Sequence, residues 1–149
     1  MPKGRELVGL PVINEDEGDE IGRVRDILFE ENQIKAFILD NGNWLRHPRL
    51  VYFHDLKDKG PKTFTIVNKN VLKQEIPEGM KRWQEIKGFR IYNTAGQDLG
   101  LLEDLIVELP SGEIIALEIS TGLINDLIDG RKEISLTGEM NWGKDSFIV

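Results

Sequence analysis

The chain has 149 residues, of which 40% are hydrophobic and 30% are charged, a balance typical of a folded globular protein rather than of a disordered one. It contains no cysteine, which excludes disulfides, thiolate zinc sites and cysteine nucleophiles. The net charge of −7 means that the molecule as a whole repels polyanions.

The opening residues, MPKGRELVGLPV, contain no apolar stretch long enough for a signal peptide or a membrane anchor. Together with the missing cysteine, this predicts a cytoplasmic protein without membrane insertion.

The sequence repeats itself at an offset that changes from 79 to 78, 80 and 83 residues. The matched segments are 9–14 with 88–93, 22–29 with 100–107, 34–39 with 114–119, and 60–66 with 143–148. Every change in the offset falls between segments, where turns tolerate differences in length. We therefore predict a duplication, with a boundary near the turn at Pro77 that divides the chain into repeats 1–78 and 79–149.

The matched segments are rich in β-branched and aromatic residues and are bounded by turn residues, which predicts strands. Asn41-Gly42 is typical of a tight hairpin, because both central positions of that turn need a positive φ. The third segments align Phe37 and Leu39 with Leu117 and Ile119. This shared apolar face predicts the interior of each repeat.

The second segments, which begin at Gly22 and Gly100, break simple alternation at the same place in both repeats. Their apolar residues stand three positions apart there, which predicts one extra residue in a β-bulge. Asp26 and Asp104 stand at this bulge, and we expect each to accept hydrogen bonds from backbone N–H groups that the bulge leaves unpaired. These four residues are predicted to be structural, and catalysis by the two carboxylates is the alternative.

One segment has helical spacing, with Leu123, Ile124, Leu127 and Ile128 on a single face. Gly130 follows where a C-terminal cap belongs. We predict a helix of about two turns that packs on the core and closes one barrel end. A membrane or partner surface is the alternative for such an amphipathic stretch.

These segments carry a family resemblance. The chain resembles a tandem of PRC-barrel domains in three patterns, which are G-x-x-V at 9–12, G-x-V-x-D-I-L at 22–28 and I-x-A-F-I-L at 34–39. The resemblance covers essentially the whole chain, twice. It implies an all-β fold of two small six-stranded barrels, with one short helical segment.

The resemblance also implies a fold used for contact rather than for chemistry. The chain is similar to the cytoplasmic domain of the photosynthetic reaction centre H subunit, which packs against other proteins. It is likewise similar to the C-terminal domain of a ribosome maturation factor. It lacks the membrane helix of the first and the preceding domain of the second, so neither specific role is expected here.

No set of catalytic residues is recognisable, and we expect a protein that is not an enzyme and uses no cofactor. The two histidines, His47 and His54, lack a third ligand that would complete a metal site. The acidic run 15–20 lacks the ligand spacing of a calcium-binding loop, so it predicts a solvated hairpin tip and no bound metal.

The segment from Arg46 to Arg82 is the best candidate for binding, because it carries nine Lys and Arg against four Asp and Glu. Its basic residues interleave with aromatic ones, which is compatible with RNA contact, and an ordinary solvated basic face is the alternative. The candidate binding residues are Trp44, Arg46, Arg49, Lys57, Lys59 and Lys62.

The favoured function is a protein-interaction or assembly module that offers the surface of two repeats to another protein. The alternative is an RNA- or ribosome-associated maturation factor that uses the basic 46–82 surface. Trp44, Trp83 and Trp142 are expected at barrel ends or between the repeats. The sequence leaves the oligomeric state open.

Overall fold

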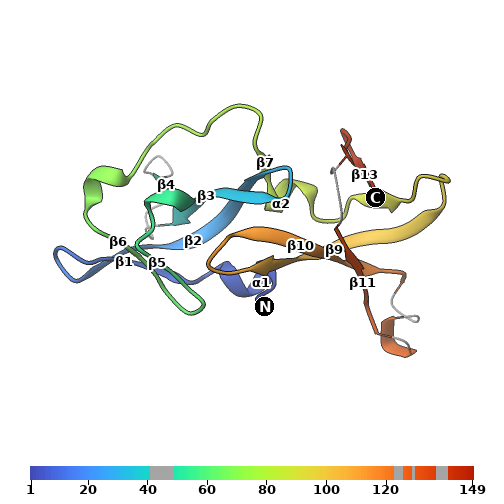
Figure 1. Cartoon of the computed structure of the whole chain (residues 1–149), viewed down its shortest axis with the longest axis horizontal. Helices are drawn as coiled ribbons and strands as arrows, with labels where there is room; N and C mark the ends of the chain where they lie inside the picture. Colours follow the sequence, from blue (N-terminus) through green and yellow to red (C-terminus); the bar gives the residue numbers. More distant parts are fainter. Residues whose placement is uncertain (41–48, 123–125, 129, 137–140) are drawn as a thin grey trace.

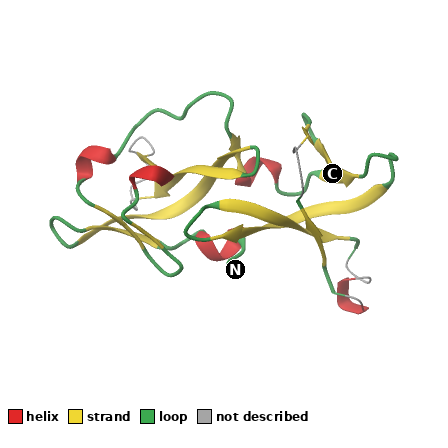
Figure 2. Ribbon diagram, in the orientation of Figure 1, coloured by secondary structure: helices red, strands yellow, loops and turns green. Residues whose placement is uncertain are grey.

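The computed structural model describes residues 1–40, 49–122, 126–128, 130–136 and 141–149. Strands dominate it, and the helices are single turns (Figure 2). The strands of this described part belong to one hydrogen-bonded sheet. The predicted all-β class is therefore confirmed.

The strands of the first repeat neighbour one another in the order β4-β3-β2-β1-β6-β5. The pair β1 and β6 is parallel, whereas the other pairs are antiparallel. Their bounds are β1 (Pro11–Asn14), β2 (Asp19–Glu30), β3 (Gln33–Asp40), β4 (Arg49–Tyr52), β5 (Asp58–Lys59) and β6 (Phe64–Ile66).

The second repeat has the same topology, with the order β11-β10-β9-β8-β13-β12 and a parallel pair formed by β8 and β13. Their bounds are β8 (Arg90–Tyr92), β9 (Asp98–Glu108), β10 (Glu113–Ser120), β11 (Lys132–Ser135), β12 (Asn141–Trp142) and β13 (Ser146–Ile148). The shared strand order confirms the duplication. Within the described residues, no ladder joins the two end strands of either repeat, so closure of the barrels stays a prediction.

The two repeats exchange their first helices. The helix α1 (Gly4–Leu7) begins the first repeat but packs on β9 of the second. The helix α2 (Trp83–Ile86) and the short strand β7 (Lys81–Arg82) begin the second repeat but lie against β2 of the first (Figure 1). Two 3-10 turns, η1 (Phe53–Asp55) and η2 (Lys69–Val71), lie within the first repeat.

The central hairpins of the two repeats meet at the starts of β3 and β10, where Gln33 pairs with Glu113. The Ile34 N–H donates to the Gly112 carbonyl over 2.9 Å, and the Ile114 N–H donates to the Asn32 carbonyl over 2.7 Å. Gln33 and Glu113 occupy equivalent repeat positions. An approximate two-fold axis therefore passes between them and relates the two halves of the molecule.

One apolar core runs through both repeats, and it includes the four aligned residues predicted to face the interior. Phe29 on β2 meets Trp142 on β12 edge to face, with ring centroids 5.5 Å apart. Trp83 is 2% exposed and packs in the same core. The prediction was barrel ends or contacts between the repeats, and the contact of Trp142 with Phe29 agrees with the second of these. Trp44 lies outside the described residues.

The helical segment after β10 differs from its prediction. Residues 126–128 are helical, but Leu127 is 79% exposed and Ile128 is 74% exposed. The prediction that they pack on the core is wrong, because helical spacing shows that two side chains share a face but not what covers it. Leu123 and Ile124 lie outside the described residues.

Candidate functional site

The predicted β-bulge is present in both repeats. Across β2 and β3 the register shifts between Val24 and Asp26, and across β9 and β10 it shifts between Leu102 and Asp104. In each repeat the residue between these two positions has no partner in the ladder. This places the two aspartates at equivalent positions in the centre of the molecule.

Asp26 is buried and its carboxylate is fully engaged. Its Oδ1 atom accepts from the backbone N–H of Ile27 over 2.8 Å and from that of Gln84 over 3.0 Å. Its Oδ2 atom lies 3.3 Å from Nε of Arg82. Gln84 and Arg82 belong to the second repeat, so Asp26 connects the repeats.

Asp104 makes the equivalent contacts with the first repeat. Its Oδ1 atom accepts from the Leu105 N–H over 2.8 Å and from the Arg5 N–H over 3.2 Å. Burial raises the pKa of Asp104, and the hydrogen bonds from Leu105 and Arg5 oppose that effect. Both aspartates are occupied by the protein itself, and this geometry supports the structural role over catalysis.

Gly22 and Gly100 lie where a strand passes close to its neighbour. A Cβ atom on Gly22 would meet the Asp40 carbonyl oxygen at 2.8 Å, and one on Gly100 would meet that of Ser120 at 2.3 Å. Gly100 also has a φ of 126°, which other residues rarely adopt. Both glycines therefore permit the close approach.

A buried carboxylate that the sequence analysis did not single out is Glu118 on β10. Its side chain is 3% exposed, and it pairs with Lys3, with Arg5 over 3.1 Å and with Arg131 over 2.9 Å. Desolvation acts to raise the pKa of Glu118, but hydrogen bonds from Lys3, Arg131 and Arg5 outweigh it and lower the pKa to about 2. The sequence did offer one sign of this residue, because Glu118 stands where the first repeat has the apolar Ile38.

The basic segment is partly neutralised by the acidic hairpin that joins β1 to β2. Lys57 lies 2.6 Å from Glu15, and Lys69 lies 3.5 Å from Glu17 and 3.2 Å from Asp19. These pairs lower the positive charge that the segment offers to a polyanion.

The remaining candidate binding residues that the structure describes are Arg49, Lys59 and Lys62. A guanidinium nitrogen of Arg49 donates to the Ile21 carbonyl, and Lys59 donates to the Leu56 carbonyl over 3.0 Å. Lys62 is exposed in the turn before β6. Trp44 and Arg46 lie outside the described residues, so they are not placed relative to the others.

His54 is an exposed residue that stacks on Tyr52, with ring centroids 5.4 Å apart, and its Nε2 atom lies 3.6 Å from Asp55. His47 lies outside the described residues. Among the residues that the structure does describe, no three His, Asp or Glu side chains come together as a metal site would require.

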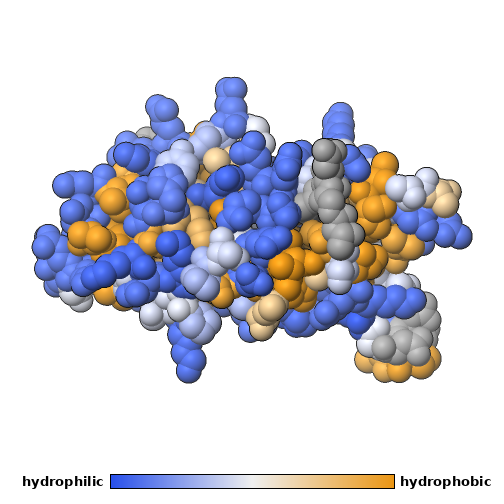
Figure 3. Space-filling model, in the orientation of Figure 1, coloured by the Kyte–Doolittle hydropathy of each residue, from blue (hydrophilic) through white to orange (hydrophobic). Residues whose placement is uncertain are grey.

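Among the described residues, a strongly exposed apolar feature is the helical turn 126–128, which we call the apolar tip because it carries Leu127 and Ile128. Figure 1 shows it projecting at the lower right, and Figure 3 shows hydrophobic surface there. Its polar groups anchor it to β10, since Asp126 accepts from the Ser120 hydroxyl and from the Thr121 N–H over 3.2 Å. The side chains of Leu127 and Ile128 remain exposed to solvent.

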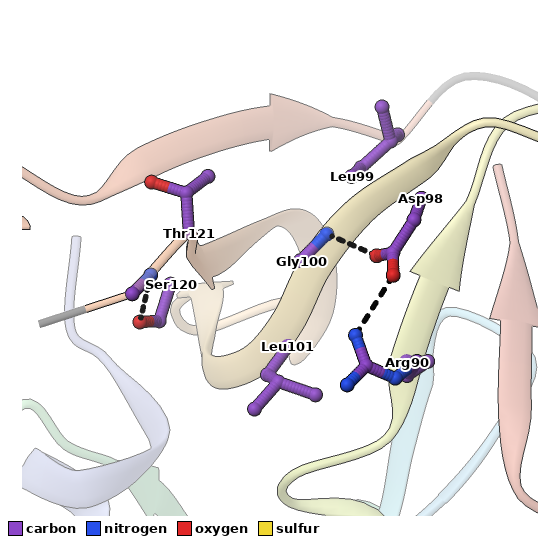
Figure 4. Close-up of a pocket in the computed structure, with 8 residues that line it drawn as sticks. Arg90, Asp98, Leu99, Gly100, Leu101, Ser120 and Thr121 are labelled. Carbon is purple, nitrogen blue, oxygen red and sulfur yellow. Dashed lines mark hydrogen bonds and ion pairs between the residues drawn. The ribbon is translucent and has the colours of Figure 1, made fainter. Parts of the chain in front are cut away.

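An open pocket of about 460 Å³ lies beside the root of the apolar tip (Figure 4). Its polar groups engage one another, since Arg90 donates to Asp98 over 2.8 Å and the Gly100 N–H donates to Asp98 over 2.9 Å. Ser120 and Leu101 also line the pocket. The hydroxyl of the lining residue Ser120 donates to the Asp126 carboxylate of the apolar tip.

The comparisons agree with this duplicated architecture. The family model of the PRC-barrel domain matches residues 3–72 and, a second time, residues 78–149. The chain belongs to the PRC-barrel family. The tandem arrangement expected from the sequence patterns is therefore confirmed for this PRC-barrel protein.

A relative in Bacillus subtilis (strain 168) is described as the uncharacterized protein YrrD. It is 26% identical over 137 residues, an alignment that covers 87% of this chain and 75% of the relative. In the described part of this PRC-barrel chain, no helix is both long and apolar enough to cross a bilayer.

Proposed function

We propose that this tandem PRC-barrel protein is a non-catalytic, cytoplasmic interaction module that binds another protein through the apolar tip. The exposure of Leu127 and Ile128 carries the proposal, because two large aliphatic side chains are held in water at one end of the molecule. Their burial by a partner would contribute on the order of 1.5–3 kcal/mol for each side chain.

The way in which the apolar tip is held supports a contact role. Asp126 fixes its start to β10, and Arg131 just beyond it pairs with the buried Glu118. A segment fixed by polar contacts loses little further freedom when it binds, so more of the apolar contact energy is retained. A loosely attached segment would offer no such advantage.

The charge of the molecule favours a protein over a polyanion as the partner. The net charge is −7, and Lys57 and Lys69 of the basic segment already have carboxylate partners. Nucleic acid binding depends on several uncompensated cations that lie along a stripe. An apolar contact does not depend on them.

Crosslinking in the native cell tests the proposal. A photoreactive residue placed at position 132, an exposed lysine four residues beyond Ile128, is expected to capture one defined protein, which is then purified and titrated against the module. In the double variant Leu127→Asp, Ile128→Asp, both the crosslink and the binding should fall at least tenfold. The matched control is Val67→Asp, which adds a charge at a 55% exposed valine of the first repeat and should leave binding unchanged.

Three outcomes would remove the proposal. Binding by the double variant that equals wild type would show that the apolar tip is not the contact. Capture of RNA alone, with loss of that capture at high salt, would favour the RNA-associated alternative. Flotation of the wild type, but not of the double variant, with phosphatidylcholine vesicles would assign the tip to a lipid surface.

A further inference from the structure

A second pocket, of about 400 Å³, lies where the two repeats meet. We call it the junction pocket, and the residues that matter for its chemistry are Gln33, Lys35, Phe53, His54, Lys59 and Ser111. Ser111 comes from the second repeat and the others from the first. The pocket therefore exists only because the turn between β9 and β10 lies against the first repeat.

The walls of the junction pocket are fixed by close contacts. The Gln33 side-chain amide donates to the Ser111 carbonyl over 2.7 Å. A Cβ atom on Gly112 would meet the Phe53 ring at 2.7 Å, so only glycine lets this turn approach the ring. Leu109 reaches into the first repeat beside Gly60.

The charge of the junction pocket has one sign. Lys35 and Lys59 line it, and none of the residues that line it carries a carboxylate. Two carboxylates contact its lining residues from outside the pocket. Asp55 lies 3.6 Å from Nε2 of His54, and Glu108 accepts a hydrogen bond from the Ser111 hydroxyl over 3.2 Å. The chain as a whole carries a net charge of −7.

The two lysines keep donors available for a ligand. The Lys59 ammonium uses one N–H on the Leu56 carbonyl and lies 5.6 Å from the centre of the Phe53 ring, so two donors remain. Within the described residues, no carboxylate pairs with Lys35. The second repeat has Ile115 at the position equivalent to Lys35, so the fold itself does not require a cation there.

We propose that the junction pocket binds a carboxylate of a partner protein, a glutamate or aspartate side chain in an acidic segment. Lys35 and Lys59 would each donate to the carboxylate, and Phe53 would contact its methylene groups. This inference rests on the proposed function, because it assumes a protein partner and adds that the partner carries an acidic segment. A single carboxylate fits better than a nucleic acid backbone, because Lys57 and Lys69 of the same basic segment are paired with carboxylates within the chain.

The test uses the full chain and an acetylated, amidated tetraglutamate peptide as the probe. Titration followed by backbone amide NMR should give saturable shifts at Gln33, Lys35, Lys59 and Ser111. The variants Lys35→Gln and Lys59→Gln should each weaken binding about tenfold, the effect of losing one charge-assisted hydrogen bond. Lys62→Gln removes an exposed lysine of the same segment outside the pocket and should leave the affinity unchanged. Unshifted amides in the second-repeat strands check that each variant keeps its fold.

The proposal is overturned if tetraglutamate gives no saturable shift at these amides, or if tetraglutamine shifts them equally. It is also overturned if Lys62→Gln weakens binding as much as Lys59→Gln. Tighter binding of an oligouridylate to the same amides would assign the pocket to nucleic acid instead. Loss of peptide binding would leave the crosslink that depends on Leu127 and Ile128 intact, so failure here is distinguishable from failure of the proposed function.

Discussion

Asp26 accepts a hydrogen bond from the backbone N–H of Gln84 over 3.0 Å, although 58 residues separate the two along the chain. The same bond recurs with the repeats interchanged, where Asp104 accepts from the N–H of Arg5. In each case the carboxylate also satisfies the N–H that follows it in the bulge. The signature aspartate of each repeat thus holds the first helix of the other.

Replacement of either aspartate by alanine should destabilise the protein by about 2 kcal/mol, because buried backbone donors lose their acceptor. Urea unfolding of Asp26→Ala and Asp104→Ala measures this as a lower midpoint. Asp16→Ala, at an exposed position in the hairpin turn, is the control and should change the midpoint little. Equal effects at the three positions would contradict the connecting role.

The shared core predicts that the repeats unfold together. Phe29→Ala should cost about 3–5 kcal/mol, because it removes a fully buried ring that contacts Trp142 of the other repeat. Circular dichroism and tryptophan fluorescence should report one coincident transition in this variant and in wild type. Two separate transitions would show that the repeats are independent units.

The strand segments and the bulge could be predicted from the sequence because both depend on local patterns that occur twice. The three-residue spacing from Val24 to Ile27 indicates one extra residue wherever the rest of the strand goes. The exchange of α1 and α2 could not be predicted, since each repeat could satisfy its own aspartate equally well on local grounds. Only the packing of the two repeats determines which helix lies on which strand.

The candidate site was harder to predict for a similar reason. Helical spacing around Leu127 indicates a common apolar face, but burial depends on where the chain leaves β10. The basic segment was predicted from composition, whereas the partners of Lys57 and Lys69 come from a hairpin about forty to fifty residues earlier in the chain. The junction pocket combines both repeats and has no contiguous pattern.

Gly100 should tolerate substitution poorly. In Gly100→Ala the new Cβ would lie 2.3 Å from the Ser120 carbonyl oxygen, and its φ of 126° disfavours any side chain. A loss of roughly 3 kcal/mol or more is expected from combined clash and strain. Gly96→Ala is the matched control, because Gly96 has a φ of 80° with open space around it and should lose only about 1 kcal/mol. Equal losses of stability in the two variants would show that the close approach of Gly100 to the Ser120 carbonyl is unimportant.

Glu118 should make the free energy of unfolding depend on pH in the acidic range. Burial acts to raise its pKa, but the pairs with Lys3, Arg131 and Arg5 prevail and lower it from 4.5 to about 2. A group whose pKa falls on folding stabilises the folded state above its unfolded pKa. The contribution, roughly 2–3 kcal/mol, should therefore be complete above about pH 5 and be lost as the pH falls towards 2.

Comparison of wild type with Glu118→Gln isolates this effect from that of Asp104. Burial raises the pKa of Asp104, so that residue favours folding as the pH falls and partly offsets the loss at Glu118. The difference in unfolding free energy between wild type and Glu118→Gln should be largest at pH 7 and shrink steadily between pH 5 and 2. Glu103→Gln removes a more exposed carboxylate 3.8 Å from Arg131 and should retain the wild-type pH dependence. A constant difference across this pH range would mean that the three cations do not hold Glu118 in its ionised form.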